Sequence, residues 1–505
     1  MYENPSVFSS KDLPASRRAA QFIMPRIDFQ DPGSVRRAER LARDFCVCGF
    51  IIFNGDVERV RETTRRLSAL SEFPLFFGCD VERGLGQRVS GGTLFPFAMA
   101  QGAMDDEELL RRQAVITARE MKYCGLNLAF APVLDVNSEP QNPIINVRAF
   151  SDDPAVVSKL GGVFAEIMQK EGVLACGKHF PGHGATLEDS HACLPTVERS
   201  LERLMDSDLL PFREAIGKRL HCVMPAHVCY TAFDPLGVPA TLSEPILRGL
   251  LRGRLGFNGL IVSDSFRMDA LGGDEREEEN ILAALASGVD IVLDPRDPEG
   301  FLERRAEDGF FKDTARGESL SRISYAKGLF PSGGEEIPSP DFKKNREEAE
   351  EITRRSACVV RRGRLSGEKT SVFHFGREDT EELLAGIREG FSEGGVTLEK
   401  SFCCPELPPR ENVSSLVCVL SAAPAGWTEN CIVPPAIADY VNGLSSFPGE
   451  KILLTFGSPY PAAEFPFFDT VISLFDSSRA AGRAAAEILA GERPSAAKLP
   501  VRIDL

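Results

Sequence analysis

The chain has 505 residues, of which 43% are hydrophobic and 26% are charged, and its formal net charge is −16. This length exceeds one ordinary domain and fits two domains, or one large barrel with an addition. The acidic balance argues against a nucleic-acid partner, because phosphate binding needs a basic face. No apolar run approaches the roughly 18 residues that cross a bilayer, so we expect no membrane partner.

The N-terminus and the cysteines together predict a cytoplasmic location. The first 22 residues lack a basic stretch followed by an apolar core, so no signal peptide is expected. Thirteen is an odd number of cysteines, and they fall inside apparent strands and helices without the spacing of zinc ligands. We interpret them as buried free thiols in a reducing compartment.

Eight short apolar runs, separated by amphipathic stretches, fill the first three hundred residues. Eight strand–helix units over this length predict a (β/α)8 TIM barrel. A doubly wound open sheet is the alternative, but it seldom needs eight units and usually has a Gly-rich first turn, which is missing here. The predicted strands are residues 22–29, 49–55, 74–80, 126–136, 172–179, 221–227, 259–265 and 289–295.

The pattern changes after the eighth run. A charged stretch that contains PSGGEEIPSPDF indicates a linker, and five further apolar runs alternate with helical segments beyond it. We therefore predict a barrel over residues 1–310, a linker over 311–355 and a smaller α/β sandwich domain over 356–505. The five strands expected in that domain are residues 357–362, 371–376, 416–423, 451–458 and 469–475.

Unusual polar residues stand where the predicted barrel strands end. Catalytic side chains of TIM barrels come from the C-terminal ends of the strands and from the loops after them, so these residues are candidates for a site. They are Asp80, Lys178, His179, His227 and Asp264 at strand ends, with Arg88 and Arg148 in loops.

The histidines give the sharpest signal. Five of the six histidines in the chain fall between positions 179 and 227, although His221 and His374 are expected to be structural. The run KHFPGHGATLEDSH lies in this region, and long polar loops at that end of a barrel usually serve sites. By contrast, Asp264 taken alone fits a helix N-cap as well as a catalytic carboxylate.

The stretch GKHFPGHGATLEDSH resembles the signature of glycoside hydrolase family 3, in its β-N-acetylglucosaminidase branch, where KHFPGHG precedes an Asp-Ser-His triplet. Flanking segments, among them LNLAFAPVLDVNSEPQNPIINVRAF, VMPAHVCYTAFDP and GLIVSDSFRMDAL, follow the family's order and spacing. The resemblance covers about residues 75 to 295. It implies a TIM-barrel glycosidase that needs no cofactor and no metal.

The resemblance also implies a role for each matching residue. Asp264 corresponds to the nucleophile, His191 to the general acid/base and Asp189 to its partner. One departure concerns the loop after the third strand, which reads DVERGLGQR where the family often reads Asp-x-Glu-Gly-Gly-Arg-Val-Gln-Arg. The expected ligands of the nonreducing-end sugar are Asp80, Arg88, Arg148, Lys178 and His179.

These residue types suit retaining glycoside hydrolysis. A carboxylate stabilises the oxocarbenium-like transition state and then bonds to the anomeric carbon, while an acid protonates the leaving oxygen. Histidine can be that acid because imidazole titrates near neutral pH, and Asp189 can fix its tautomer. The resemblance implies β-linked N-acetylglucosamine from muropeptide or chitin fragments. A single tryptophan, Trp427, favours a short substrate cleaved from its nonreducing end.

Other functions remain open at this point. The same site could act as a β-glucosidase, or as a phosphorylase, because a neutral histidine does not repel phosphate. A sugar-binding protein without activity is a further alternative, although Asp264 and His191 are both present. A metal-dependent TIM-barrel hydrolase is another, but Lys178 would repel a cation and the first strand has no His-x-His pair. Its ligands would be His179, His183, Asp189, His191 and His227.

Overall fold

The computed structural model divides the chain into two compact units. The first comprises Met1–Leu94, Leu110–Asp135 and Gly161–Asn345, and the second comprises Phe95–Leu109, Val136–Leu160 and Arg346–Leu505. The domain limits predicted at residues 310 and 355 stay predictions. The structure describes residues 6–9, 13–305, 308–332, 337–362, 369–375, 381–393, 397–403, 414–422 and 433–504.

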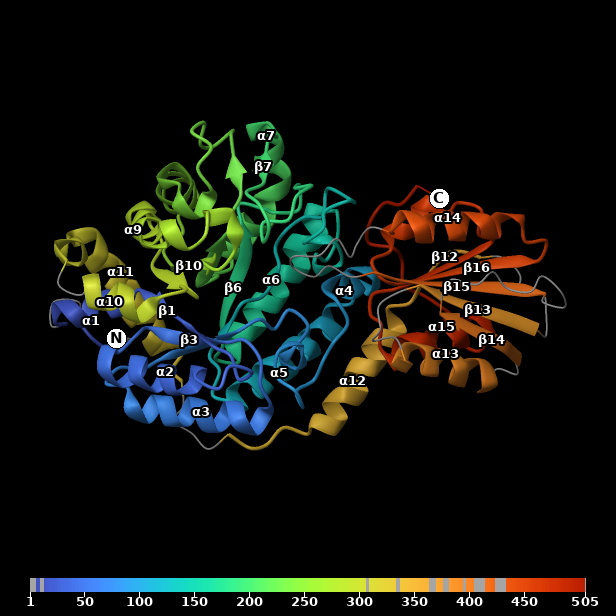
Figure 1. Ribbon diagram of the computed structural model, residues 1–505, viewed down its shortest axis with the longest axis horizontal. Coiled ribbons are helices and arrows are strands. Elements are labelled where there is room, and N and C mark those ends of the chain that lie inside the picture. The colour runs from blue at the N-terminus through green and yellow to red at the C-terminus, as the bar shows by residue number, and fades with distance from the viewer. Residues whose placement is uncertain are drawn as a thin grey trace. The chain divides into compact units, whose positions relative to one another are not determined.

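The first unit is built on a closed parallel barrel, as predicted (Figure 1). The elements β1 (Ile23–Met24) and β2 (Arg26–Ile27) belong to one strand. They are interrupted only at Pro25, which has no N–H group to donate to the sheet. The first half of this strand pairs with β11 and its second half with β3, which closes the sheet. The other strands are β3 (Gly49–Ile52), β4 (Phe76–Cys79), β5 (Leu128–Ala129), β6 (Leu174–Phe180), β8 (Cys222–Pro225), β10 (Leu260–Ser265) and β11 (Ile291–Leu293).

All eight predicted barrel strands are confirmed. Each neighbouring pair runs parallel, in the order β1-β11-β10-β8-β6-β5-β4-β3-β2. The doubly wound alternative is therefore wrong, because an open sheet would leave two edge strands. Since all strands point the same way, their C-terminal ends share one face of the barrel.

Helices between the strands bury one apolar side against the sheet. In α3 (Val57–Leu70), the side chain of Asp56 caps the first turn by accepting a hydrogen bond from the backbone N–H of Arg59. The spacing of the buried residues is that of a helix with one apolar face. These residues are Val57, Val60, Thr63, Thr64 and Leu67.

Helices also occupy part of the predicted linker. These are α11 (Thr314–Leu329) and α12 (Phe342–Arg355). Further helices of the barrel loops are α2 (Ser34–Arg40), α9 (Glu277–Ser287) and α10 (Pro298–Arg305).

The second unit contains a six-stranded sheet with helices on both faces, the expected α/β sandwich. Side chains of β15 (Ser415–Ala422) alternate between two cores. Val417 and Val419 face α13 (Glu381–Glu393) and α15 (Arg479–Leu489), whereas Leu416 and Leu420 face α14 (Pro435–Gly443). The order is β12-β17-β16-β15-β13-β14, with only β12 antiparallel to its neighbour.

The sequence found five of these six strands: β12 (Cys358–Arg361), β13 (Lys369–Phe375), β15, β16 (Glu450–Gly457) and β17 (Thr470–Leu474). It missed the edge strand β14 (Thr397–Cys403), whose polar sequence TLEKSFC lacks an apolar run. Trp427, on which the expectation of a short substrate partly rests, lies outside the described residues.

Two further observations bear on the expected location. Ten cysteines of the described part of the chain are free thiols, and nine of them are buried, as the sequence predicted. Within the described residues, no helix is both long enough and apolar enough to cross a membrane. The cytoplasmic location itself stays a prediction.

Candidate active site

The barrel brings most of the predicted site residues to one face. Asp80 follows β4 directly, Lys178 and His179 are the fifth and sixth of the seven residues of β6, and Asp264 is the fifth of the six residues of β10. All lie at C-terminal strand ends, where barrels carry their chemistry. Arg148 belongs to the second unit, where its guanidinium donates to the carbonyl oxygen of Ile144 at 2.9 Å. Its part in the site therefore stays a prediction.

Lys178 is the centre of a buried charge cluster. Its ammonium lies 3.0 Å from Oδ1 of Asp80 and 2.7 Å from Oε1 of Glu82, and its side chain is only 4% exposed. Arg88 donates to the other oxygen of Asp80 at 3.1 Å and stacks over the ring of Phe53. The two cations hold the Asp80 carboxylate in place while 19% of its side chain remains exposed for a ligand.

The charge of Asp80 follows from these contacts. Burial raises its pKa, but the charges of Lys178 and Arg88 lower it by more, so the pKa lies below the usual value. An ionised carboxylate accepts hydrogen bonds from sugar hydroxyls, and the ammonium of Lys178 can donate to them.

A fully buried carboxylate, Asp135, positions His179. Its Oδ2 lies 2.7 Å from Nδ1 of His179, and its Oδ1 accepts from the backbone N–H groups of His179 at 3.1 Å and His183 at 2.7 Å. Burial raises the pKa of Asp135, but the charge and the hydrogen bond of His179 lower it by more. The pKa of Asp135 therefore lies below its usual value. With Nδ1 engaged by Asp135, Nε2 is the ring nitrogen of His179 that can meet a ligand.

Asp264 is ionised despite its burial. Burial raises its pKa, but the neighbouring side chains of His179, His227 and Lys178 together lower it by more, so the pKa lies below the usual range. The backbone N–H of Ser265 donates to Oδ1 of Asp264 at 2.7 Å. A partly accessible carboxylate with this charge state can act as a nucleophile at neutral pH.

His227 contacts the residue that follows Asp264. Its ring is fully buried, with Nδ1 2.8 Å from Oγ1 of Thr241 and Nε2 3.2 Å from the carbonyl oxygen of Ser265. Burial lowers the pKa of His227 by more than the Asp264 carboxylate raises it, so the imidazole is neutral near pH 7. A neutral imidazole can therefore donate from Nε2 to the residue that follows Asp264.

The Asp-Ser-His triplet forms a compact turn. Oδ1 of Asp189 accepts from the backbone N–H of His191 at 2.8 Å and lies 2.8 Å from its Nδ1. Between them, the buried hydroxyl of Ser190 lies 2.8 Å from Nε2 of His183. His183 also contacts Oγ1 of Thr186 at 3.0 Å, so its described contacts shape the loop, as the sequence indicated.

The triplet is tied to the strand that carries Asp264. The backbone N–H of Asp269 donates to the carbonyl oxygen of His191 at 3.1 Å. Asp269 lies only five residues after Asp264, in the loop that leaves β10. This hydrogen bond joins the loop after β6 to the loop after β10.

Comparisons with known proteins identify the family of this chain. The family model described as "Glycosyl hydrolase family 3 N terminal domain" matches residues 18–323. The chain belongs to glycosyl hydrolase family 3. All eight predicted site residues lie within the matched segment.

Individual relatives share about half of this family 3 chain. It is 37% identical over 263 residues to a β-hexosaminidase of Chromobacterium violaceum, covering 50% of this chain and 73% of that protein. It is 35% identical over 271 residues to β-hexosaminidase A of Pseudoalteromonas piscicida, covering 49% of this chain but only 45% of that protein.

A solved structure extends the likeness over both units. A family 3 β-N-acetylglucosaminidase from Paenibacillus sp. str. FPU-7 superposes with a TM-score of 0.84 at 27% identity. The match covers 97% of this chain and 99% of that structure. The family 3 fold therefore includes the second unit as well as the barrel.

A glycine in the family signature is explained by a close approach. Gly182 has φ +133°, a conformation that other residues rarely adopt, and a Cβ there would lie 2.9 Å from Cβ of Asp208. Its carbonyl oxygen accepts from the hydroxyl of Tyr230 at 2.7 Å. This packing fixes the start of the loop that carries His183 and His191.

Sequence reasoning missed two carboxylates of this family 3 site. Asp135 lies in the apolar run LNLAFAPVLDV and was not predicted as a site residue. It is the one charged residue of that run, and because charged residues are seldom buried without a partner, it could have been identified from the sequence. Glu82 stood in the loop whose sequence departs from the family pattern, and its contact with Lys178 appears only in the fold.

The proposed metal ligands form no cation site. Among the residues that the structure describes, no three His, Cys, Asp or Glu side chains are arranged to hold a metal ion. Instead, the ring nitrogens of His183 contact the hydroxyl groups of Thr186 and Ser190, and Nδ1 of His191 lies beside Asp189.

Proposed function

We propose that this family 3 protein is a retaining, exo-acting β-N-acetylglucosaminidase that removes nonreducing-end N-acetylglucosamine from short glycans or muropeptides. The observation that carries the proposal is the hydrogen bond between His191 and the loop after β10, which joins the imidazole–carboxylate pair to the segment that follows Asp264. The relatives from Chromobacterium violaceum and Pseudoalteromonas piscicida are β-hexosaminidases, which supports the same activity.

In the first step, the carboxylate of Asp264 attacks the anomeric carbon while protonated His191 donates to the leaving oxygen. This produces a glycosyl ester on Asp264 and a free alcohol. The negative charge of Asp189 stabilises the imidazolium before transfer and orients the ring.

In the second step, His191 removes a proton from water as the oxygen attacks the anomeric carbon and the ester bond to Asp264 breaks. Two inversions at the same carbon retain its configuration. The sugar is bound by Asp80, Arg88, Lys178 and His179, which is the role proposed for Arg148 as well.

The test is release of 4-nitrophenol from its β-N-acetylglucosaminide and from its β-glucoside, with and without EDTA. We expect turnover of the first substrate that EDTA does not change and that Asp264→Asn abolishes. Asp274→Asn is the matched control, because this carboxylate is 84% exposed and, among the described residues, forms an ion pair with Arg296 alone. Its activity should equal that of the wild type.

Three outcomes would change the proposal. Preferential turnover of the glucoside would make the enzyme a β-glucosidase. Formation of N-acetylglucosamine 1-phosphate in phosphate buffer would make it a phosphorylase. Activity that EDTA abolishes and Asp264→Asn retains would contradict the mechanism and favour a metal-dependent hydrolase.

A further inference from the structure

The loop after β10 contains the backbone N–H that donates to the carbonyl oxygen of His191. This donor belongs to Asp269, the first residue of a short helical turn, Asp269–Leu271. The three residues between Ser265, which ends β10, and this turn belong to no helix or strand. The position of the Asp269 N–H therefore depends on contacts that hold these three residues in place.

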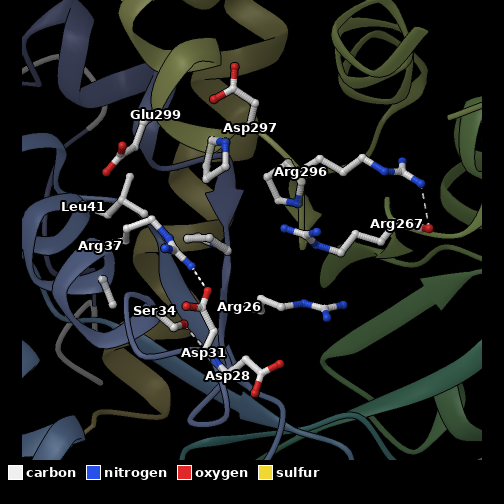
Figure 2. A pocket seen from close by; sticks show the side chains of 14 residues that line it. Arg26, Asp28, Asp31, Ser34, Arg37, Leu41, Arg267, Arg296, Asp297 and Glu299 are labelled. Carbon is white, nitrogen blue, oxygen red and sulfur yellow. Dashed lines mark hydrogen bonds and ion pairs between the residues drawn. The ribbon is translucent and has the colours of Figure 1, made fainter. Parts of the chain in front are cut away.

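Arg296, in the loop after β11, provides such contacts. Its side chain lines a cavity between this loop, the loop after β10 and the helices α2 and α10 (Figure 2). Nη1 donates to the carbonyl oxygen of Phe266 at 2.6 Å, and Nη2 donates to that of Arg267 at 2.7 Å. Among the described residues, neither oxygen accepts a hydrogen bond from a backbone N–H, so the guanidinium satisfies both.

The same guanidinium also contacts two carboxylates further along the loop. Nε lies 2.8 Å from Oδ1 of Asp274, and Nη2 lies 3.6 Å from Oδ1 of Asp269. These carboxylates are 84% and 60% exposed, so the two ion pairs contribute little. The side chain of Arg296 is only 19% exposed, and its hydrogen bonds to the two carbonyl oxygens are short and charge-assisted. These hydrogen bonds therefore dominate.

The backbone of Arg296 is held as well. Oε1 of Glu277, the first residue of α9, accepts from the backbone N–H of Arg296 at 2.6 Å, and Oε2 accepts from that of Asp297 at 3.2 Å. Glu277 is buried. Because the backbone and the guanidinium of Arg296 are both engaged, the side chain can fix the geometry of the loop that it contacts.

We propose that Arg296 is a positioning residue for the acid/base and acts through the loop after β10. Its guanidinium fixes the peptide groups of Phe266 and Arg267, which places the N–H of Asp269, and this N–H holds the backbone of His191. The inference rests on the proposed glycosidase activity, in which His191 protonates the leaving oxygen. A displaced proton donor loses rate steeply, so the loss of Arg296 should appear in the protonation of the leaving group.

The test compares 4-nitrophenyl and 4-methoxyphenyl β-N-acetylglucosaminides. The 4-nitrophenolate leaves with little protonation, whereas the more basic 4-methoxyphenolate needs it. We expect Arg296→Gln to lower kcat/KM by about 20-fold for the 4-methoxyphenyl compound and by about twofold for the 4-nitrophenyl compound. Arg296→Lys should recover part of the loss, because an ammonium can donate to one carbonyl oxygen. A smaller folded fraction would lower both values equally and leave their ratio unchanged.

Two control variants remove a charge but keep the hydrogen bonds to the carbonyl oxygens. Arg304→Gln removes a guanidinium whose ion pairs are with Glu278 and Asp297. Asp274→Asn removes the exposed ion pair of Arg296 itself. Both variants should keep the wild-type ratio of the two kcat/KM values.

A second pair of variants tests the link to His191 directly. Asp269→Pro removes the N–H that donates to His191, whereas Asp269→Ala keeps it. Proline fits the first position of a helical turn, and Met268 already has the extended conformation that precedes proline, with φ −71° and ψ 138°. Asp269→Pro should change the ratio as Arg296→Gln does, and Asp269→Ala should not. This pair also provides the test if Arg296→Gln does not fold.

The His191→Ala variant decides whether Arg296 acts through His191. Because this variant lacks the acid, adding Arg296→Gln should leave its ratio unchanged. A wild-type ratio in Arg296→Gln and Asp269→Pro, or a further change of ratio in the absence of His191, would overturn the positioning role while the glycosidase activity stands. If the wild type turned over neither compound, or if His191→Ala spared the 4-methoxyphenyl compound, the proposed function itself would be overturned, and this inference with it.

Discussion

The two ends of the barrel each bury a carboxylate completely but surround it with different partners. At the N-terminal end of β11, Asp290 accepts from the guanidinium groups of Arg252 at 2.7 Å and Arg322 at 2.8 Å. In the segment that follows β5, Asp135 contacts the ring of His179 and two backbone N–H groups. Neither carboxylate is exposed.

The difference separates stability from chemistry. Burial raises the pKa of Asp290, but Arg322 and Arg252 lower it by more, and arginine keeps its charge throughout the accessible pH range. The C-terminal end uses histidine and lysine, which can exchange protons or pass hydrogen bonds to a substrate. Substitutions at the C-terminal end should therefore lower activity, whereas substitutions at the N-terminal end should lower the free energy of unfolding.

The largest expected effect is that of His191→Ala at the C-terminal end. Loss of the acid/base should lower kcat for a 4-nitrophenyl substrate by about 10²- to 10⁴-fold, and more for an alkyl aglycone that needs protonation. The measurement is kcat against leaving-group basicity. An equal loss for both kinds of aglycone would mean that His191 does not protonate the leaving oxygen.

Asp290→Asn should have the opposite profile. It leaves Arg252 and Arg322 without their buried anion, and we expect the free energy of unfolding to fall by about 3–5 kcal/mol. The kcat of the remaining folded protein should be unchanged. Urea denaturation and active-site titration check the two parts, and a loss of kcat in fully folded protein would break the comparison.

A third prediction concerns the buried carboxyl of Asp208, which packs against Gly182. Burial raises its pKa to about 6, although Arg199 lowers it in part. The folded protein therefore holds this proton more tightly than the unfolded chain, so the contribution to stability is complete below about pH 4 and is lost as the pH rises to about 6.

Asp208→Asn removes this pH dependence. Between pH 4 and pH 7 the variant should gain about 3 kcal/mol in the free energy of unfolding relative to the wild type. Urea denaturation at several pH values measures the difference. Parallel stability curves for the two proteins would contradict a raised pKa of Asp208.

The smallest expected effect is that of Asp135→Asn. The amide oxygen can still accept from the backbone N–H groups of His179 and His183, so the fold should persist, but the charge that orients the His179 ring is lost. We expect kcat/KM to fall by about tenfold, mainly through KM. A variant that kept wild-type kinetics would show that His179 needs no such partner.

Much of this arrangement could be predicted from the order of residues along the chain. Apolar runs predicted all eight barrel strands, and parallel strands must end at one face, so Asp80, Lys178, His179 and Asp264 were expected together. Local spacing also predicted the contact between Asp189 and His191, which are two residues apart.

The remainder depends on contacts between distant segments. Asp135 meets His179 only because β5 and β6 are neighbours, and Asp294 meets Arg26 only because the barrel closes between its first and last strands. The sequence around each of these residues shows a charged residue in an apolar run but does not indicate its partner. The edge strand β14 was missed for the related reason that its residues are mostly polar.

The most direct test of the central claim is to trap the glycosyl-enzyme. A 5-fluoro-N-acetylglucosaminyl fluoride slows the second step, so the intermediate should accumulate and be seen as a mass increase of the intact protein. We predict that peptide mapping places the sugar on Asp264 and that Asp264→Asn takes up no label. A label on another residue, or turnover without any covalent intermediate, would contradict the retaining mechanism.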